Sequence, residues 1–141
     1  SGCSAMCLPT TRPLQQSRLT SGFGMRAHPI TGQIVPHRGV DLVSWNDPLV
    51  RAPGGGRISL AERNGNAGLM VTIEHGSGLS TSYMHLAEIH VEPNEYVAKG
   101  DALGVMGDTG ATTGAHLHYE VKLGDQHLNP RSVFRVATND H

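Results

Sequence analysis

The chain has 141 residues, a net charge of −1 with neutral histidines, 18 glycines and few aromatic side chains. This length suits one domain that buries its own core without needing disulfide or metal cross-links. Lysine and arginine are spread along the chain, so the basic patch of a nucleic-acid-binding protein is missing. No apolar segment is long enough to span a bilayer as a helix. These features exclude a nucleic-acid binder and a helical membrane span.

Short apolar runs alternate with glycine-rich turn signals through most of the chain, and no long stretch shows apolar residues at helical spacing. This pattern predicts strands joined by turns. We therefore expect an all-β fold, a compact antiparallel β-sheet or sandwich domain, over residues 19–135. Residues 1–18 lack periodicity and are interpreted as an N-terminal arm or linker, and residues 136–141 as a C-terminal tail.

Cys3 and Cys7 are the only cysteines, and both lie in the predicted arm. A disulfide in an exported protein and two incidental thiols both fit so short a spacing. Gly2-Cys3 also matches the end of a lipoprotein signal, but the apolar segment that precedes such a site is not visible.

The first candidate cluster is His37 and Asp41, in the sequence His-Arg-Gly-Val-Asp. Gly39 between them can bend the segment without steric cost. Imidazole and carboxylate groups are both zinc ligands. Arg26 and His28 precede this cluster in a loop marked by glycine and proline, and the guanidinium of Arg26 has the geometry to pair a substrate carboxylate through two hydrogen bonds.

The middle of the chain has the alternation of half-buried strands. Residues 58–62 and 69–74 are predicted to be strands joined by an Asn-Gly-Asn turn. His75 ends the second strand, and we expect a structural hydrogen-bonding role for it. In the next run, residues 79–86, a period of two places Tyr83 and His85 on one face. His85 is therefore expected to project where Tyr83 projects.

The second candidate cluster is His116 and His118, which follow a loop rich in glycine and threonine. Residues two apart on a strand project from the same face, so both imidazoles should enter one pocket. One can bind a metal while the other transfers protons. Glu120 and Lys122 continue this polar face, and a strand with a wholly polar inner face is explained best by a groove.

Taken together, the two clusters supply three ligands of histidine and aspartate type, which leaves the fourth position of a catalytic zinc to water. Two unrelated accidents are the alternative interpretation. His90, His127 and His141 have no partner pattern and are predicted to be surface residues.

Several segments between about Thr20 and Pro130 occur in a characteristic order. They are Ser-Gly-Phe-Gly-Met-Arg-Ala-His-Pro-Ile-Thr-Gly, His37 to Asp41, Asn66 to Gly78, Ser80 to Leu86, Lys99 to Asp101, Gly107 to Gly110 and His116 to Glu120. In these segments the chain resembles the M23 family of zinc metallopeptidases, the lysostaphin and LytM type. The resemblance implies one catalytic Zn²⁺ and a LytM-type, duplicated-hybrid-motif-like sheet. It also implies that His37, Asp41 and His118 bind the zinc and that His85 and His116 are the catalytic histidines.

Members of this family cut peptide cross-links of peptidoglycan, so the resemblance implies peptidoglycan stem peptides as the substrate. It also implies a monomer that is exported to the periplasm, the cell envelope or the extracellular space, or carried by a phage virion. His116 would be the general base, and His85 would stabilise the oxyanion or pass a proton to the leaving amine. The reverse division of these roles uses the same residues.

The Phe-Gly-Met-Arg-Ala-His-Pro-Ile-Thr-Gly loop resembles members that cut the D-alanyl to diaminopimelate cross-link more than those that cut glycyl bridges. Arg26, His28 and Asn66 are the candidate substrate contacts. We expect a groove walled by residues 26–32, 65–68 and 107–114. Three alternatives stay open: a glycyl-glycine endopeptidase, a carboxypeptidase on the same fold, and a non-cutting LytM-like activator of another wall hydrolase. Activators typically lack metal ligands that this chain keeps.

Overall fold

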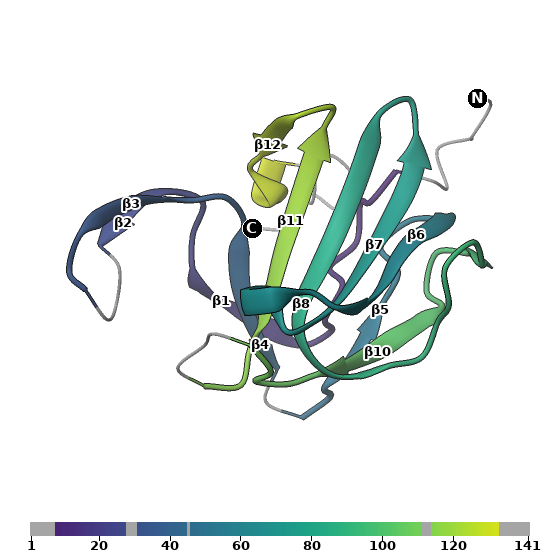
Figure 1. Cartoon of the computed structure of the whole chain (residues 1–141), viewed down its shortest axis with the longest axis horizontal. Helices are drawn as coiled ribbons and strands as arrows, with labels where there is room; N and C mark the ends of the chain where they lie inside the picture. The colour runs from purple at the N-terminus through teal and green to yellow at the C-terminus, as the bar shows by residue number, and fades with distance from the viewer. Residues whose placement is uncertain (1–7, 28–30, 45, 111–113, 133–141) are drawn as a thin grey trace.

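The structure, a computed structural model, describes residues 8–27, 31–44, 46–110 and 114–132. Its strands form one ten-stranded sheet and a separate two-stranded sheet that projects to one side (Figure 1). Every strand pair is antiparallel. The predicted all-β, antiparallel fold is confirmed. No helix in the described ranges is long and apolar enough to cross a bilayer.

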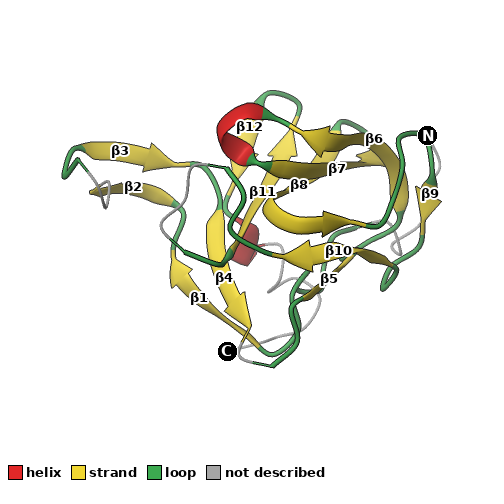
Figure 2. Cartoon of the chain, turned by 60° about the horizontal axis from the view of Figure 1, so that its bottom comes forward, coloured by secondary structure: helices red, strands yellow, loops and turns green. Residues whose placement is uncertain are grey.

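The main path of the large sheet runs in the order β1-β4-β11-β8-β7-β6-β9, with β12 paired to β11, β10 paired to β8 and β5 paired to β10 (Figure 2). The small sheet pairs β2 with β3, and the 3-10 helix η2 joins β6 to β7. The elements are β1 (Ser17–Ser21), β2 (Gly24–Ala27), β3 (Ile34–His37), β4 (Val40–Ser44), β5 (Leu49–Arg51), β6 (Gly56–Arg63), η2 (Gly65–Ala67), β7 (Leu69–Gly76), β8 (Leu79–Ile89), β9 (Tyr96–Val97), β10 (Ala102–Met106), β11 (Leu117–Leu123) and β12 (Gln126–Leu128).

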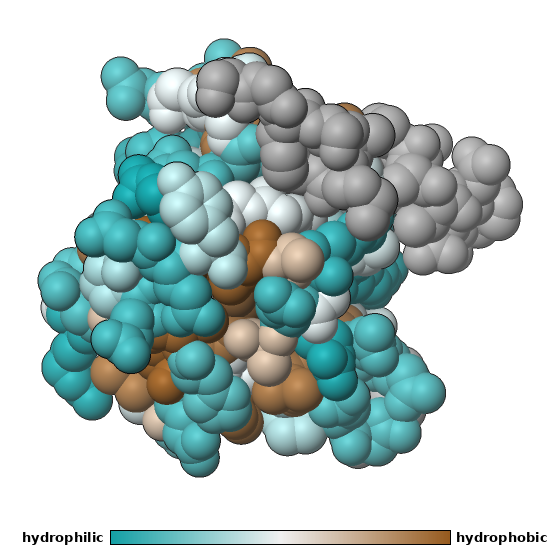
Figure 3. Space-filling model, turned by 90° about the vertical axis from the view of Figure 1, so that its right-hand side faces the viewer, coloured by the Kyte–Doolittle hydropathy of each residue, from teal (hydrophilic) through white to brown (hydrophobic). Residues whose placement is uncertain are grey.

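The core lies on one face of the central strands, as the alternation in β11 shows. Leu117, Tyr119 and Val121 are fully buried. The Tyr119 ring packs 5.3 Å from the ring of Tyr83 on β8. The residues between them are only half-buried and point to the opposite face, which the sequence predicted to be a polar site face. Apolar side chains also gather at the surface on the side of β6 and β10, surrounded by polar ones (Figure 3).

The N-terminal segment belongs to the domain from residue 8 onward. Leu14 has no exposed surface, lies in the core cluster and forms an isolated bridge with Val50. Lys99 donates a hydrogen bond of 2.8 Å to the buried Thr10. The second half of the predicted arm, residues 8–18, therefore packs against the domain, because a short segment without periodicity still buries single apolar side chains. Residues 1–7, with both cysteines, and residues 133–141 lie outside the described ranges.

Strand β8 loses its alternation at His85. The φ angle of His85 is +65°, and the register of β8 against β7 shifts between Tyr83 and Leu86, the stretch that contains this residue. A bulge of this kind adds one residue to a strand and turns the following side chain to the other face. Tyr83 therefore lies in the core while the His85 ring lies 6.3 Å from that of His118 on the site face. The expectation that His85 projects where Tyr83 projects is wrong.

Candidate metal centre

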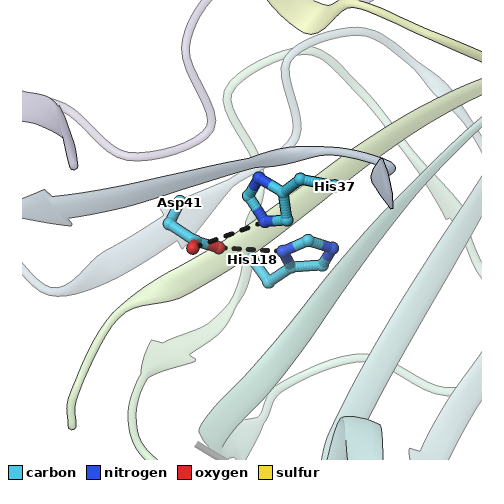
Figure 4. Close-up of side chains that lie close together, drawn as sticks. All are labelled: His37, Asp41 and His118. Carbon is cyan, nitrogen blue, oxygen red and sulfur yellow. Dashed lines mark hydrogen bonds and ion pairs between the residues drawn. The ribbon is translucent and has the colours of Figure 1, made fainter. Parts of the chain in front are cut away.

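Three side chains from β3, β4 and β11 meet at one point of the sheet. His37 ends β3, Asp41 is the second residue of β4, and His118 is the second residue of β11. Asp41 and His118 are direct partners in the β4–β11 pairing. One possible ligand atom from each of the three residues lies within 4.8 Å of the others (Figure 4). The sequence-predicted ligand set is brought together by this pairing.

The hydrogen bonds of His37 fix its tautomer. Its Nδ1 lies 2.6 Å from the carbonyl oxygen of Gly22, and a carbonyl only accepts, so Nδ1 carries the proton. The Nε2 lone pair then faces Asp41 Oδ2 at 3.4 Å, and this buried nitrogen makes no hydrogen bond. Buried polar atoms are normally satisfied, and a cation between nitrogen and carboxylate would satisfy this one. Two imidazoles and a carboxylate fit Zn²⁺ with one position open to water.

His118 lies between two carboxylates. Its Nδ1 donates to Asp41 Oδ1 at 2.8 Å and its Nε2 donates to Glu120 Oε2 at 3.0 Å. Burial alone lowers the pKa of His118, but these two hydrogen bonds and the carboxylate charges raise it to about 9. Burial raises the pKa of Asp41, yet the hydrogen bond from His118 and the neighbouring histidines hold it well below its usual value. In the metal-free protein at neutral pH, His118 is therefore an imidazolium paired with the carboxylates of Asp41 and Glu120.

We expect the metal-free protein to lose stability as pH rises from about 6.5, the ordinary histidine pKa, to about 9, the pKa of His118 in the folded chain. Because the folded-state pKa is raised, the contribution is complete below the unfolded pKa and disappears as His118 loses its proton. The zinc-loaded protein should lack this decline, since the metal takes the place of the proton on Nδ1. Thermal unfolding of the metal-free and zinc-loaded forms across this pH range measures the decline in stability. Equal stability of the metal-free form throughout would contradict the paired arrangement.

Gly39, between the two candidate ligands of the first cluster, is required by close packing. A Cβ there would lie 2.3 Å from the carbonyl oxygen of Tyr119 and 2.9 Å from Glu120 Cγ on β11. Gly39 was predicted to let the segment bend. In the structure, the close approach of β11 is the reason that a glycine is needed at this position.

We expect Gly39→Ala to lower the free energy of unfolding by at least about 2 kcal/mol, because backbone atoms of β11 must move. It should also weaken metal binding, because the displaced strand carries His118. Chemical denaturation and zinc titration measure the two effects. Gly22→Ala is the control, since its Cβ would meet only Leu19 Cδ2 at 3.9 Å. Equal stability of the two variants would contradict the packing argument.

Two further histidines lie beside the three candidate ligands. The rings of His85 and His116 are 5.0 Å apart, and His116 Nε2 lies 3.5 Å from Asp41 Oδ1. His85 Nδ1 donates to the carbonyl of Thr109 at 2.7 Å, and His116 Nδ1 donates to the carbonyl of Gly114 at 2.9 Å. With Nδ1 protonated, a neutral ring carries its lone pair on Nε2. Burial is the main cause that lowers the pKa of His85, so its neutral form is favoured.

Thr109 fixes the position of His85 by joining three segments. Its carbonyl binds His85, its hydroxyl donates to the Leu86 carbonyl at 2.6 Å, and the hydroxyl accepts from the Leu69 amide at 3.0 Å. Gly68 follows η2 with a φ of +68°, and a Cβ there would lie 2.4 Å from Thr109. The turn after β6 and the loop before β11 therefore meet at His85.

Of the predicted substrate contacts, Asn66 lies exposed in η2. Arg26 has its backbone in β2, but its side chain and the whole of His28 lie outside the described part of the chain. The substrate-binding assignments and the groove stay predictions.

The remaining histidines that the structure describes differ in burial. His75 is buried, with hydrogen bonds to the Gly55 carbonyl at 2.8 Å and Thr81 Oγ1 at 2.7 Å, so its structural role is confirmed. His90 is exposed, as predicted. His127 is not a plain surface residue: it is 20% exposed and its Nε2 lies 3.1 Å from Glu120 Oε1. His141 lies outside the described residues.

Glu120 and His127 are the site residues that sequence reasoning missed. Glu120 accepts from His118 and His127, and although burial raises its pKa, these partners lower it overall. The period-two pattern placed Glu120 on the site face, but no motif connected it with His127. The turn at Gly124-Asp125 was the available signal, since a hairpin there returns β12 alongside β11.

An antiparallel β domain with a His-Asp-His donor set and two adjacent histidines has the architecture of a metallopeptidase domain. The chain belongs to peptidase family M23, whose sequence model matches residues 35–130. The predicted family is therefore confirmed.

Three similar proteins illustrate the relationship. The peptidoglycan DD-endopeptidase ShyC of Vibrio cholerae is 40% identical over 122 residues, which cover 86% of this chain and 28% of ShyC. A zinc-containing peptidase from Vibrio cholerae has a crystal structure with a TM-score of 0.75 and 32% identity, over 91% of this chain and 38% of that one. The catalytic domain of lysostaphin from Staphylococcus simulans has a TM-score of 0.74 and 26% identity, over 84% and 92%. The chain spans less than a third of the length of the curated relatives that it matches, 27% and 28% in the first two.

Proposed function

We propose that this chain is a zinc-dependent peptidoglycan endopeptidase that cuts the D-alanyl to diaminopimelate cross-link. The observation that carries the proposal is the His37, Asp41 and His118 cluster with His85 and His116 beside it. The DD-endopeptidase name of ShyC supports the bond, and the zinc-containing structural relative supports the metal. The natural partners are peptidoglycan stem peptides, which places the protein in the cell envelope, the periplasm or outside the cell.

When bound, zinc would supply an activated water and polarise the scissile carbonyl. His37 would bind it through Nε2, His118 through Nδ1, and Asp41 through a carboxylate oxygen. The carbonyls of Thr109 and Gly114 hold the other two rings so that each presents Nε2 as its proton-accepting atom. His116 is proposed to take the proton from the attacking water because its Nε2 lies nearest the ligands. His85 is proposed to act on the side of the leaving amine.

Mass spectrometry of muropeptides tests this function. Purified, zinc-loaded protein is incubated with diaminopimelate-type peptidoglycan and, separately, with a pentaglycine peptide. We expect cross-linked dimers to decrease while monomers increase, and pentaglycine to remain intact.

Each other result identifies a different activity. Cleavage of pentaglycine alone would leave the zinc chemistry and overturn the substrate. Loss of terminal D-alanine from monomeric pentapeptides, with dimers unchanged, would identify a carboxypeptidase. No change in either substrate by a protein with zinc bound would favour a non-cutting activator of another hydrolase.

A further inference from the structure

We propose that Glu120 and His127 are positioning residues that orient the metal ligand His118. Glu120 accepts a hydrogen bond from His118 Nε2–H and thereby directs Nδ1 toward Asp41, and His127 holds the Glu120 carboxylate in place. The proposal rests on the metal site of the proposed function, but it makes no assumption about the bond that is cut.

The two nitrogens of a histidine ring are not equivalent in a metal site. A neutral imidazole that binds a metal through one nitrogen must carry its proton on the other, and the acceptor of that proton fixes the tautomer and the ring plane. In His118 the nitrogen facing the other two ligands is Nδ1, 2.8 Å from Asp41 Oδ1. The nitrogen facing away is Nε2, 3.0 Å from Glu120 Oε2. Glu120 is thus the group that selects the tautomer needed at the metal.

The strand geometry explains why these three side chains meet. His118 and Glu120 are two apart on β11, so they project from the same face. His127 on β12 is the direct partner of Lys122 and therefore lies diagonally across from Glu120. His127 uses the second carboxylate oxygen, Oε1, at 3.1 Å, while His118 uses Oε2. Both oxygens are held, so the carboxylate has a defined orientation.

Burial strengthens these contacts. The side chains of His118, Glu120 and His127 are 13%, 15% and 20% exposed. Little water competes for their hydrogen bonds, so the arrangement is more rigid than an ion pair on the surface.

The chain contains a matched pair without a metal ligand. Glu88 Oε1 lies 3.0 Å from His90 Nε2, the same two residue types at the same distance, but the two side chains are 66% and 38% exposed. A substitution of Glu88 or His90 changes the same functional group as a substitution of Glu120 or His127, but Glu88 and His90 are distant in sequence from the three proposed ligands. Glu88→Gln is therefore the control for Glu120→Gln.

Zinc affinity, measured by competition with a fluorescent chelator, tests the role of Glu120. We expect Glu120→Gln to weaken zinc binding by about 10- to 100-fold, the range typical of residues that orient a metal ligand, and Glu88→Gln to bind like the unmodified chain. The absorption spectrum of the Co²⁺-loaded Glu120→Gln protein should also change, since the spectrum reports ligand geometry rather than fold stability. Unmodified zinc affinity and an unmodified Co²⁺ spectrum in Glu120→Gln would overturn the proposal.

A pair of His127 variants separates positioning from simple packing. His127→Leu removes the donor, so we expect weaker zinc binding than in the unmodified chain. His127→Gln keeps an N–H donor, so it should restore most of the affinity. Equal loss in both variants would assign His127 to packing and overturn its part of the proposal. These measurements need no substrate: a chain that binds zinc in this Glu120-dependent way but cuts no peptidoglycan would contradict the proposed function alone.

Discussion

Asp41→Ala should abolish both stable zinc binding and cross-link cleavage. Asp41 is the one anionic group among the three proposed ligands, and it contacts His37 at 3.4 Å and His118 at 2.8 Å. Removing a residue that merely orients a ligand costs about 10- to 100-fold in affinity, so loss of the ligand itself should cost more than about 100-fold. Zinc content after gel filtration and the decrease of muropeptide dimers measure the two losses.

Asp125→Ala is the matched control for this substitution, because Asp125 is exposed in the turn between β11 and β12. It should keep its zinc and its activity. One tightly bound zinc per chain in purified Asp41→Ala would contradict the proposed ligand set.

Replacement of His85 should have the opposite signature, with zinc retained and turnover lost. The structure alters the choice of substitution. His85 has a φ of +65°, a conformation that asparagine adopts more readily than alanine, so His85→Asn preserves the bulge in β8 better than His85→Ala. Because a positioned proton-transfer group contributes about 10²- to 10⁴-fold to a rate, we expect kcat to fall by that factor. Metal analysis and the rate of dimer loss, measured on the same sample, provide the test.

His90→Asn serves as the control for His85→Asn, because His90 is an exposed histidine whose side chain pairs with Glu88. It should leave both zinc content and turnover unchanged. Loss of zinc in His85→Asn, with the fold intact, would mean that His85 is a ligand and that the proposed set is incomplete.

Several site features followed from local sequence. The spacing of His116 and His118 predicted two imidazoles on one face, and both lie beside Asp41, although β11 begins at Leu117 and His116 forms only an isolated bridge with Gly107. The alternation of Leu117, Tyr119 and Val121 predicted the opposite, buried face. These predictions depended only on the period of two, which is a property of the extended backbone. The glycine-rich turn signals likewise predicted an antiparallel all-β domain.

Local rules misplaced His85, because the period of two holds only while a strand stays regular. β8 pairs with β7, β10 and β11, and its register is regular against β11 but shifts against β7 between Tyr83 and Leu86. Nothing in residues 79–86 alone specifies that insertion. The burial of Leu14 was missed for the same reason. Leu14 lies beside Val50 at a position that exists only in the assembled sheet.

The sequence by itself determined the antiparallel β architecture and the chemical types of the proposed ligands, since both depend on neighbouring residues. Only the tertiary structure decided how those residues meet. The pairing of β4 with β11 sets Asp41 opposite His118 across 77 residues, and the β12 hairpin brings His127 to Glu120. Strand pairing between distant segments is selected by the packing of the whole core, so no local pattern encodes which nitrogen of His118 faces the metal site.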